Sequence, residues 1–350
     1  MTTALNVLML LAGLILILKG GDWFVDASVK IAKALKIPEL VIGATVVSIG
    51  TTLPELLTSL TSVIKGMIAG NEQQMQGFTD IAIGNAVGSM MCNIGLILAL
   101  VMIIKPQKAE GASFISKGLY LLSVSALVVL FSITGGALVL WEGIILLVLF
   151  VAFMGANVYE ALKKSGKIKR GKDKSKEPMY EESKSNDSDV KLDKKEKIKT
   201  ALTFIIGAGC IAGGAIFMVN GVQDLCISFG IPEQIIAVTV VAIGTSLPEL
   251  VTSITSLRKG NEDIGIGNVV GANIINATLL LGLVSVVTGR GLNIDSFTRN
   301  YVLWFMLGIT AILVVPSLFT KKAGRVQGMI MMAAFITCVS LNVCSVIGVL

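Results

Sequence analysis

The 350-residue sequence contains no histidine, only 6% aromatic residues and only 15% charged residues. Without His it lacks the commonest transition-metal ligand and the usual proton shuttle at neutral pH. Its five cysteines form no Cys-x-x-Cys pair and lie mostly in apolar sequence, so we expect neither a disulfide framework nor a thiolate metal site. Because 54% of the residues are hydrophobic and the mean hydropathy is +0.82, the composition also excludes an ordinary water-soluble domain.

Apolar runs of about 20 residues, each long enough to cross roughly 30 Å of hydrocarbon, recur along the chain. The first run carries its lysine after the apolar stretch and not before it, unlike a secretory signal peptide, so we expect it to persist as helix 1. The runs predict an all-α membrane protein with ten transmembrane helices near residues 4–26, 38–64, 80–104, 117–134, 138–160, 199–220, 232–257, 264–288, 298–317 and 326–348.

The formal net charge of +6 is explained by the way the basic residues are distributed between the two sides of the membrane. If the charged segment 161–198 is cytoplasmic, 25 of the 29 Lys and Arg residues lie on the cytoplasmic side. The positive-inside rule then places both termini outside the cell and the chain in the cell membrane as a multi-pass protein. We therefore expect the lipid bilayer as its surroundings, and neither nucleic acid nor an obligate protein as a partner.

The sequence contains one segment twice. Residues 45–66, TVVSIGTTLPELLTSLTSVIKG, and residues 239–260, TVVAIGTSLPELVTSITSLRKG, are identical at 16 of 22 positions without a gap. A second block, DIAIGNAVGSMMCN at 80–93, matches DIGIGNVVGANIIN at 263–276 in 8 of 14 positions. Equivalent helices are five apart, and because five is odd, the two copies must cross the membrane in opposite directions.

The repeats predict the organisation of the chain. Residues 1–160 and 199–350 form two inverted five-helix repeats, an arrangement that is common in transporters. Segment 161–198 is too polar to bury a core and is predicted to be a solvated cytoplasmic linker. The first repeat carries 11 extra residues around 67–78, which we assign to an external loop.

Each copy places one glutamate, Glu55 or Glu249, inside apolar sequence directly after a proline. A carboxylate within a membrane helix is costly and is normally kept for an ion or substrate pathway. The prolines also free backbone carbonyls near residues 50 and 244, and carbonyl, hydroxyl and carboxylate oxygens together suit hard cations such as Ca²⁺. The alternative, in which Gly, Thr and Pro only kink the helices, leaves both glutamates unexplained.

Small and amide residues in the second block admit two interpretations. Gly84-x-x-x-Gly88 and Gly267-x-x-x-Gly271 allow close helix packing at least as readily as ion contact. Asn93 and Asn276 supply uncharged amide oxygens to an ion site or only link helices to each other, and Ser89 is similar. The acidic residues near predicted helix ends need no function; they are Asp22, Asp26, Glu39, Asp80, Glu142 and Asp263.

At GTTLPELLTS, GTSLPELVTS and the two GNxVG blocks, the chain closely resembles the alpha-repeats of the cation/calcium antiporter superfamily, and within it the Na⁺/Ca²⁺ exchanger family of prokaryotic type. The resemblance covers nearly the whole length. It implies a secondary antiporter and not an enzyme, which extrudes Ca²⁺ in exchange for Na⁺ by alternating access. Helices 1 and 6 would slide against the rest, and Ca²⁺ and Na⁺ would be transported ions, with no cofactor.

The resemblance also implies ion ligands. They are the Glu55 and Glu249 carboxylates, the Thr51, Thr245, Ser48 and Ala242 carbonyls, the Thr52, Ser246 and Ser89 hydroxyls, and Asn93 at the centre. Asn276 stands where many members have Asp, which keeps an oxygen but removes a charge, and Ala272 stands where they have Ser. The sodium stoichiometry is therefore left open.

Other functions have less support in the sequence. Ca²⁺/H⁺ exchange is the alternative within the same class, because a Glu side chain can carry a proton as well as bind a cation. An intramembrane hydrolase would need a water-activating metal or aspartyl motif, and neither HExxH nor GxGD is present. Duplicated halves with one carboxylate each fit a carrier better than a passive channel. Without a GxxxxGK[ST] motif a primary pump is not expected.

Overall fold

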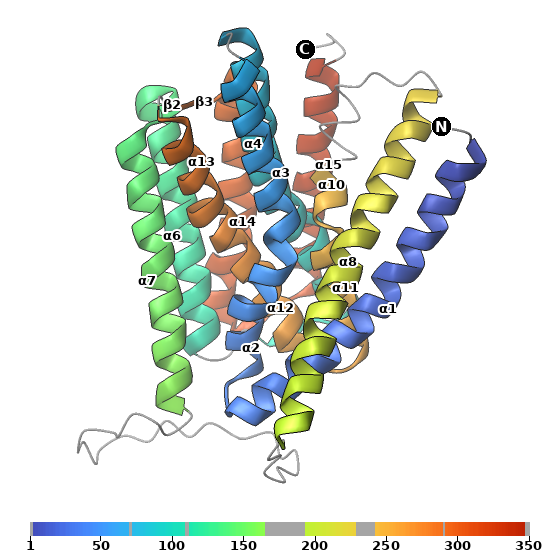
Figure 1. Cartoon of the computed structure of the whole chain (residues 1–350). Coiled ribbons are helices and arrows are strands. Elements are labelled where there is room, and N and C mark those ends of the chain that lie inside the picture. The colour runs from blue at the N-terminus through green and yellow to red at the C-terminus, as the bar shows by residue number, and fades with distance from the viewer. Residues whose placement is uncertain are drawn as a thin grey trace.

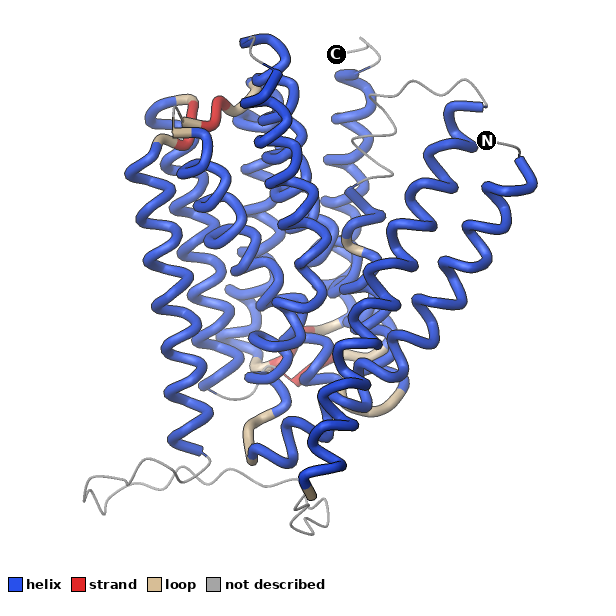
Figure 2. Tube along the Cα trace, viewed as in Figure 1, coloured by secondary structure: helices blue, strands red, loops and turns tan. Residues whose placement is uncertain are grey.

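The computed structural model describes residues 3–69, 72–108, 112–164, 193–228, 242–289 and 291–346. This part of the chain is almost entirely helical (Figures 1 and 2). The helices are α1 (Thr3–Leu35), α2 (Glu39–Ile42), α3 (Ser48–Ala69), α4 (Glu72–Cys92), α5 (Ala99–Ile104), α6 (Ala112–Gly135), α7 (Leu140–Lys164), α8 (Lys194–Ser228), α10 (Ala242–Thr245), α11 (Leu247–Arg258), α12 (Glu262–Ile275), α13 (Leu281–Thr288), α14 (Leu303–Thr320) and α15 (Arg325–Val346). π-Helical stretches span Gly43–Val47, Asn93–Leu98, Asn276–Leu280 and Thr298–Val302, and the strands are β1 (Gln107–Lys108), β2 (Ala137–Leu138), β3 (Leu292–Asn293) and β4 (Lys322–Ala323).

Within the described residues, nine helical segments are long and apolar enough to cross a membrane. They overlap nine of the ten predicted spans. The seventh, 232–257, is described only from Ala242 onward, as α10 and α11 with a break at Ser246; its earlier residues lie outside the described part of the chain. Most of the predicted linker, 161–198, also lies outside the described part of the chain. Of its residues, those up to Lys164 belong to α7 and those from Lys194 belong to α8.

Several helix boundaries differ from the sequence prediction. The residues assigned to an external loop near 67–78 are largely helical: α3 continues to Ala69 and α4 begins at Glu72, since EQQMQ favours a helix as readily as a loop. Helix α1 extends to Leu35 and not to 26. Asp22 and Asp26 therefore lie inside α1, where they pair with Lys259 Nζ at 3.4 and 2.8 Å.

The two short ladders mark opposite ends of the helix bundle. At one end β2 pairs with β3, and Gln76 near the start of α4 donates from Nε2 to the backbone carbonyl of Asn293 in β3 and accepts at Oε1 from Asn293 Nδ2. At the other end β1 pairs with β4, and nearby Lys105 forms an ion pair with Glu262 at the start of α12. Helices α3 and α12 thus run in the same direction: α3 finishes beside the β2–β3 end, and α12 begins at the β1–β4 end. Figure 1 shows that α1 begins and α15 ends toward the β2–β3 end, while α7 ends and α8 begins at the opposite end.

Helices α1 and α8 form a tight pair beside the rest of the bundle (Figure 1). Their backbones meet at glycines: a Cβ at Gly20 would lie 2.9 Å from the Gly207 carbonyl, and one at Gly214 would lie 2.7 Å from the Gly13 carbonyl. Such contacts require Gly because any side chain would separate the helices. Contact with the bundle is narrower and includes Gly21 against Val251.

The centre of the bundle is formed where α12 packs against α2, the following π-helical stretch and α3. A Cβ at Gly267 would lie 2.5 Å from the Leu40 carbonyl, and one at Gly271 would meet Ala44 and Ser48. The packing role predicted for the second GxxxG pair is therefore confirmed. The structure does not test the packing role of the first pair. No described atom lies within 4 Å of a Cβ at Gly84, and most residues that correspond by the repeat to the neighbours of Gly267 and Gly271 fall in 229–241, outside the described residues.

Candidate ion site

The glutamates Glu55 on α3 and Glu249 on α11 are both 0% exposed. They lie close enough for their negative charges to repel each other. None of the four carboxylate oxygens has a hydrogen-bond partner among the described residues, and neither side chain forms an ion pair with any of them. Two buried acidic groups without a cation are costly, so the arrangement favours a positively charged ligand between them.

The two copies of the GTxLPE segment approach this site in different backbone conformations. In the first copy a π-helical stretch, Gly43–Val47, leads directly into α3, and Pro54 lies within the helix. In the second copy the helix breaks at Ser246, whose φ and ψ are −88° and 4°, and α11 starts with Pro248 in its first turn. The predicted interruption is thus a break in one copy and a widened helix before the proline in the other.

Threonines from both copies lie at the site and bond across to the other copy. Thr51 lies beside the Glu249 carboxylate, and its hydroxyl donates to Asn268 Oδ1 at 3.0 Å. Thr245 Oγ1 donates to Asn85 Oδ1 at 3.1 Å. Asn85 and Asn268 occupy equivalent positions in the two blocks, and the sequence prediction missed both.

The remaining serine and threonine residues that were predicted to supply ligands are also buried. Ser48 donates to Gly43 O at 2.6 Å and to Asn268 O at 3.1 Å, and Thr52 donates to Ser48 O at 2.5 Å. Ser89 Oγ lies 3.3 Å from Thr245 Oγ1. Ser246 Oγ has no hydrogen-bond partner among the described residues. Ala242 is the first residue of α10, three residues before Thr245.

The two asparagines that end the second block lie fully buried at the starts of two π-helical stretches, Asn93–Leu98 and Asn276–Leu280. Such stretches are frequent at functional sites, because they disturb the regular helical bonding of the backbone. Asn93 Nδ2 donates to Asn273 Oδ1 at 3.0 Å, which leaves Asn93 Oδ1 without a donor. Both amide atoms of Asn276 also lack partners within the described residues.

The buried polar face of α11 continues beyond the predicted ligands. Thr252 and Ser256 follow Glu249 at helical spacing, are fully buried, and have hydroxyls that no described group bonds. Sequence reasoning passed over them, although the repeated TS pairs could have suggested a polar face. Together with the carboxylates and amides they form an oxygen-rich, uncharged or anionic lining, which suits hard cations.

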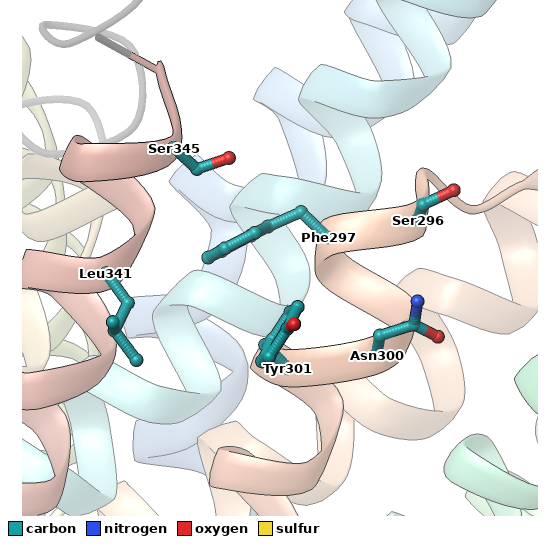
Figure 3. Close-up of a pocket in the computed structure, with 6 residues that line it drawn as sticks. All are labelled: Ser296, Phe297, Asn300, Tyr301, Leu341 and Ser345. Atoms are coloured by element: carbon teal, nitrogen blue, oxygen red, sulfur yellow. The ribbon is translucent and has the colours of Figure 1, made fainter. Parts of the chain in front are cut away.

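The hollow drawn in Figure 3 is separate from these residues. It encloses about 340 Å³ between the start of the α14 region and the end of α15, and it is lined by Ser296, Phe297, Asn300, Tyr301, Leu341 and Ser345. None of its described lining residues is acidic, and two of them, Phe297 and Tyr301, have ring centroids 5.2 Å apart. The buried carboxylate pair, and not this hollow, is the candidate ion site.

Known proteins resemble the chain along nearly its whole length. A family profile described as sodium/calcium exchanger protein matches residues 5–159 and 199–343. The sodium/calcium exchanger MaX1 of Methanosarcina acetivorans is 31% identical over 95% of this chain and 96% of its own length. The uncharacterized membrane protein MJ0091 of Methanocaldococcus jannaschii is 31% identical over 94% and 95%. The solved structure of the sodium-calcium exchanger NCX_Mj, soaked with 10 mM Na⁺ and no Ca²⁺, superimposes with a TM-score of 0.77 at 28% identity, covering 97% of this chain and 99% of that one.

Proposed function

The chain belongs to the sodium/calcium exchanger family, and on that premise we propose that it extrudes Ca²⁺ from the cell in exchange for Na⁺. It is a secondary transporter and not an enzyme. Ca²⁺ and Na⁺ are its cargo and bind in turn at the site between α3 and α11. The supporting relatives are themselves named as sodium/calcium exchangers.

The observation that carries this proposal is the pair of buried glutamates, Glu55 and Glu249, whose four oxygens have no hydrogen-bond partner among the described residues. Two negative charges are neutralised by one Ca²⁺ or by two monovalent cations. Competition between these loads for the same carboxylates provides the coupling, because the site cannot hold both at once. Backbone carbonyls of Thr51 and Thr245 and the oxygen of Asn93 would complete the ligand set.

Inverted repeats are part of the proposal. Helix α3 ends at the β2–β3 end of the bundle, whereas its equivalent, α11, ends beside α12 at the β1–β4 end. This opposition supports ten spans in two inverted halves, with the site where the halves meet. Basic residues gather at the β1–β4 end, which supports a cytoplasmic location for it and an external location for both termini; they include Lys105, Lys108, Lys321, Lys322 and Arg325.

Alternating access would come from the α1–α8 pair. These helices hold each other by backbone contacts at glycines, and they meet the bundle at fewer places, including Gly21 against Val251. A pair that is stiff internally and loosely attached externally can move as a unit past the site. Sliding would expose the carboxylates first to one side of the membrane and then to the other.

A flux experiment tests the coupling ion. Inside-out vesicles containing the protein would be followed for ⁴⁵Ca²⁺ uptake under an imposed Na⁺ gradient, a pH gradient, or neither. We expect uptake only with internal Na⁺, and none in Glu55→Gln or Glu249→Gln vesicles that contain equal amounts of folded protein. Uptake that follows the pH gradient and ignores Na⁺ would replace this proposal with Ca²⁺/H⁺ exchange; uptake without any gradient would indicate a channel.

A further inference from the structure

Two asparagines link the repeats to each other at the candidate site. Thr51 Oγ1 donates to Asn268 Oδ1 at 3.0 Å, and the equivalent Thr245 Oγ1 donates to the equivalent Asn85 Oδ1 at 3.1 Å. All four side chains are at least nine-tenths buried. Since the carbonyls of both threonines are proposed ligands, each asparagine fixes a ligand-bearing residue of the opposite repeat.

The nitrogen atoms of the same two amides are bonded unequally. Asn85 Nδ2 donates to the Glu55 carbonyl at 3.0 Å and to Ser59 Oγ at 2.9 Å. Asn268 Nδ2 is buried and has no partner among the described residues. By the repeat, its expected acceptors are the Glu249 carbonyl and Ser253 Oγ.

The sequence does not cause this difference. Both serines are present, and both make the same remaining bond: Ser59 donates to Ala82 O at 3.3 Å, and Ser253 donates to the equivalent Gly265 O at 3.4 Å. The difference is therefore conformational. In this conformation the amide clamp of the first repeat is closed, and the equivalent clamp of the second repeat is open.

The two clamps lie on opposite sides of the ion site. Ser59 is one helical turn after Glu55 on α3, which proceeds toward the β2–β3 end. Ser253 is one turn after Glu249 on α11, which proceeds toward the β1–β4 end. One clamp thus joins α3 to α4 on one side of the site, while the other would join α11 to α12 on the other side.

We propose that Asn85 and Asn268 are positioning residues that exchange clamps during transport: the Asn85–Ser59 bond closes in the conformation described here, and the Asn268–Ser253 bond closes in the conformation that opens the site to the other face. The inference rests on the proposed alternating-access function. An inverted pair of repeats makes the two conformations mirror each other in bonding, so the total number of bonds is conserved and neither conformation is strongly favoured. Neutral amides carry out the exchange without adding charge beside the carboxylates.

A matched pair of mild substitutions tests the exchange. Ser59→Ala and Ser253→Ala each remove one serine-to-carbonyl bond, but only Ser59→Ala also removes a bond to the amide in the described conformation. A neutral hydrogen bond changes an equilibrium by roughly threefold to tenfold. We expect Ser59→Ala to shift the ratio of the two conformations by that factor away from the described one, Ser253→Ala to shift it equally toward it, and the double variant to return near the starting ratio.

The ratio can be measured in two independent ways. Spin labels at Leu8 of α1 and Ile68 of α3, which are 61% and 78% exposed, report it as a distance distribution and require no transport. Ca²⁺/⁴⁵Ca²⁺ exchange in oriented vesicles reports it as the ratio of apparent Ca²⁺ affinities on the two faces, because a fractional population of the competent state lowers apparent affinity. Labels would be placed in a chain whose native cysteines are replaced.

The outcomes separate this inference from the proposed function. Shifts of opposite sign support the clamp exchange, even where the wild-type protein shows no Na⁺-driven flux. Shifts of the same sign, or none above twofold, overturn it even where flux is normal. If the serine variants do not fold, Asn85→Leu and Asn268→Leu form a second pair: both lose the threonine bond, only Asn85→Leu loses the closed clamp, and equal shifts in that pair also overturn the inference.

Discussion

Asn93 Nδ2 donates to Asn273 Oδ1 at 3.0 Å, a bond that orients the Asn93 amide with its oxygen facing no donor. Asn273 is itself held by donation from its Nδ2 to the Met90 carbonyl at 3.0 Å. Asn273 therefore fixes the orientation of the amide of Asn93, the proposed ion ligand. The repeat places Met90 at the equivalent position of the first half, so this orienting bond exists on one side only.

Removal of the orienting bond should weaken ion binding. We expect Asn273→Ala to lower the apparent Ca²⁺ affinity by roughly threefold to tenfold, because the Asn93 amide can then rotate and offer nitrogen. Asn273→Asp keeps the acceptor for Asn93 and should retain more of the affinity. Equilibrium ⁴⁵Ca²⁺ binding checks both, and equal losses in the two variants would argue against an orienting role.

Replacement of one glutamate should separate binding from folding. Glu55→Gln or Glu249→Gln removes one of two mutually repelling charges, so the ion-free protein should be at least as heat-stable as the wild type. Ca²⁺ at about 100 times its Kd should stabilise the wild type by about 2.7 kcal/mol and neither variant. Thermal unfolding in detergent, with Ca²⁺ and with a chelator, measures this; an undiminished Ca²⁺ shift in either variant would remove that glutamate from the site.

The α1–α8 contact offers a matched pair of glycines. A Cβ at Gly207 would lie 2.8 Å from the backbone nitrogen of Phe24, whereas no described atom is within 4 Å of a Cβ at Gly209. Gly207→Ala should therefore destabilise the protein by about 1–3 kcal/mol and impair transport. Gly209→Ala should be neutral or stabilising by up to about 1 kcal/mol, since alanine favours a helix. Unfolding midpoints in detergent and flux per folded molecule check the pair.

A hydroxyl at Ala272 should strengthen sodium coupling. Its equivalent, Ser89, lies 3.3 Å from Thr245 Oγ1, so Ala272→Ser would bring a hydroxyl toward Thr51 in the same relation. We expect the Hill coefficient for Na⁺ to rise by up to about one, and Ser89→Ala to lower it. Na⁺ activation curves of ⁴⁵Ca²⁺ flux measure both. An unchanged Hill coefficient in Ala272→Ser would show that the position does not contribute to Na⁺ binding.

The sequence was informative where chemistry and repetition coincide. A glutamate in apolar sequence is rare enough to be noticed once, and two at equivalent positions predict a shared site; Glu55 and Glu249 do lie together. Asn85 and Asn268 were overlooked because they stand within GNxVG, where the glycines already explained close helix packing. The role of an amide depends on the atoms that surround it. No local sequence pattern encodes the bonds of these two amides to Thr51 and Thr245, or a bond to serine that one amide makes and the other does not.

Helix boundaries were also only partly predictable. Hydropathy detects only the apolar stretch that crosses the lipid. Helix α1 continues beyond that stretch to Leu35 through VDASVKIAKAL, where charged residues on the exposed face alternate with apolar residues on the face that packs against protein. No pattern in the sequence marks the π-helical stretches that begin at the buried Asn93 and Asn276.

The paired strands restrict which parts of the molecule can move. Gln107–Lys108 pairs with Lys322–Ala323 at one end, and Ala137–Leu138 pairs with Leu292–Asn293 at the other, so main-chain bonds join the first half to the second at both ends of the helix bundle. A rocking motion of one whole half against the other would have to break both ladders in every cycle. The two halves are thus held to each other at both ends of the bundle, so the movement that the proposed transport requires falls to helices outside these ladders, namely the α1–α8 pair.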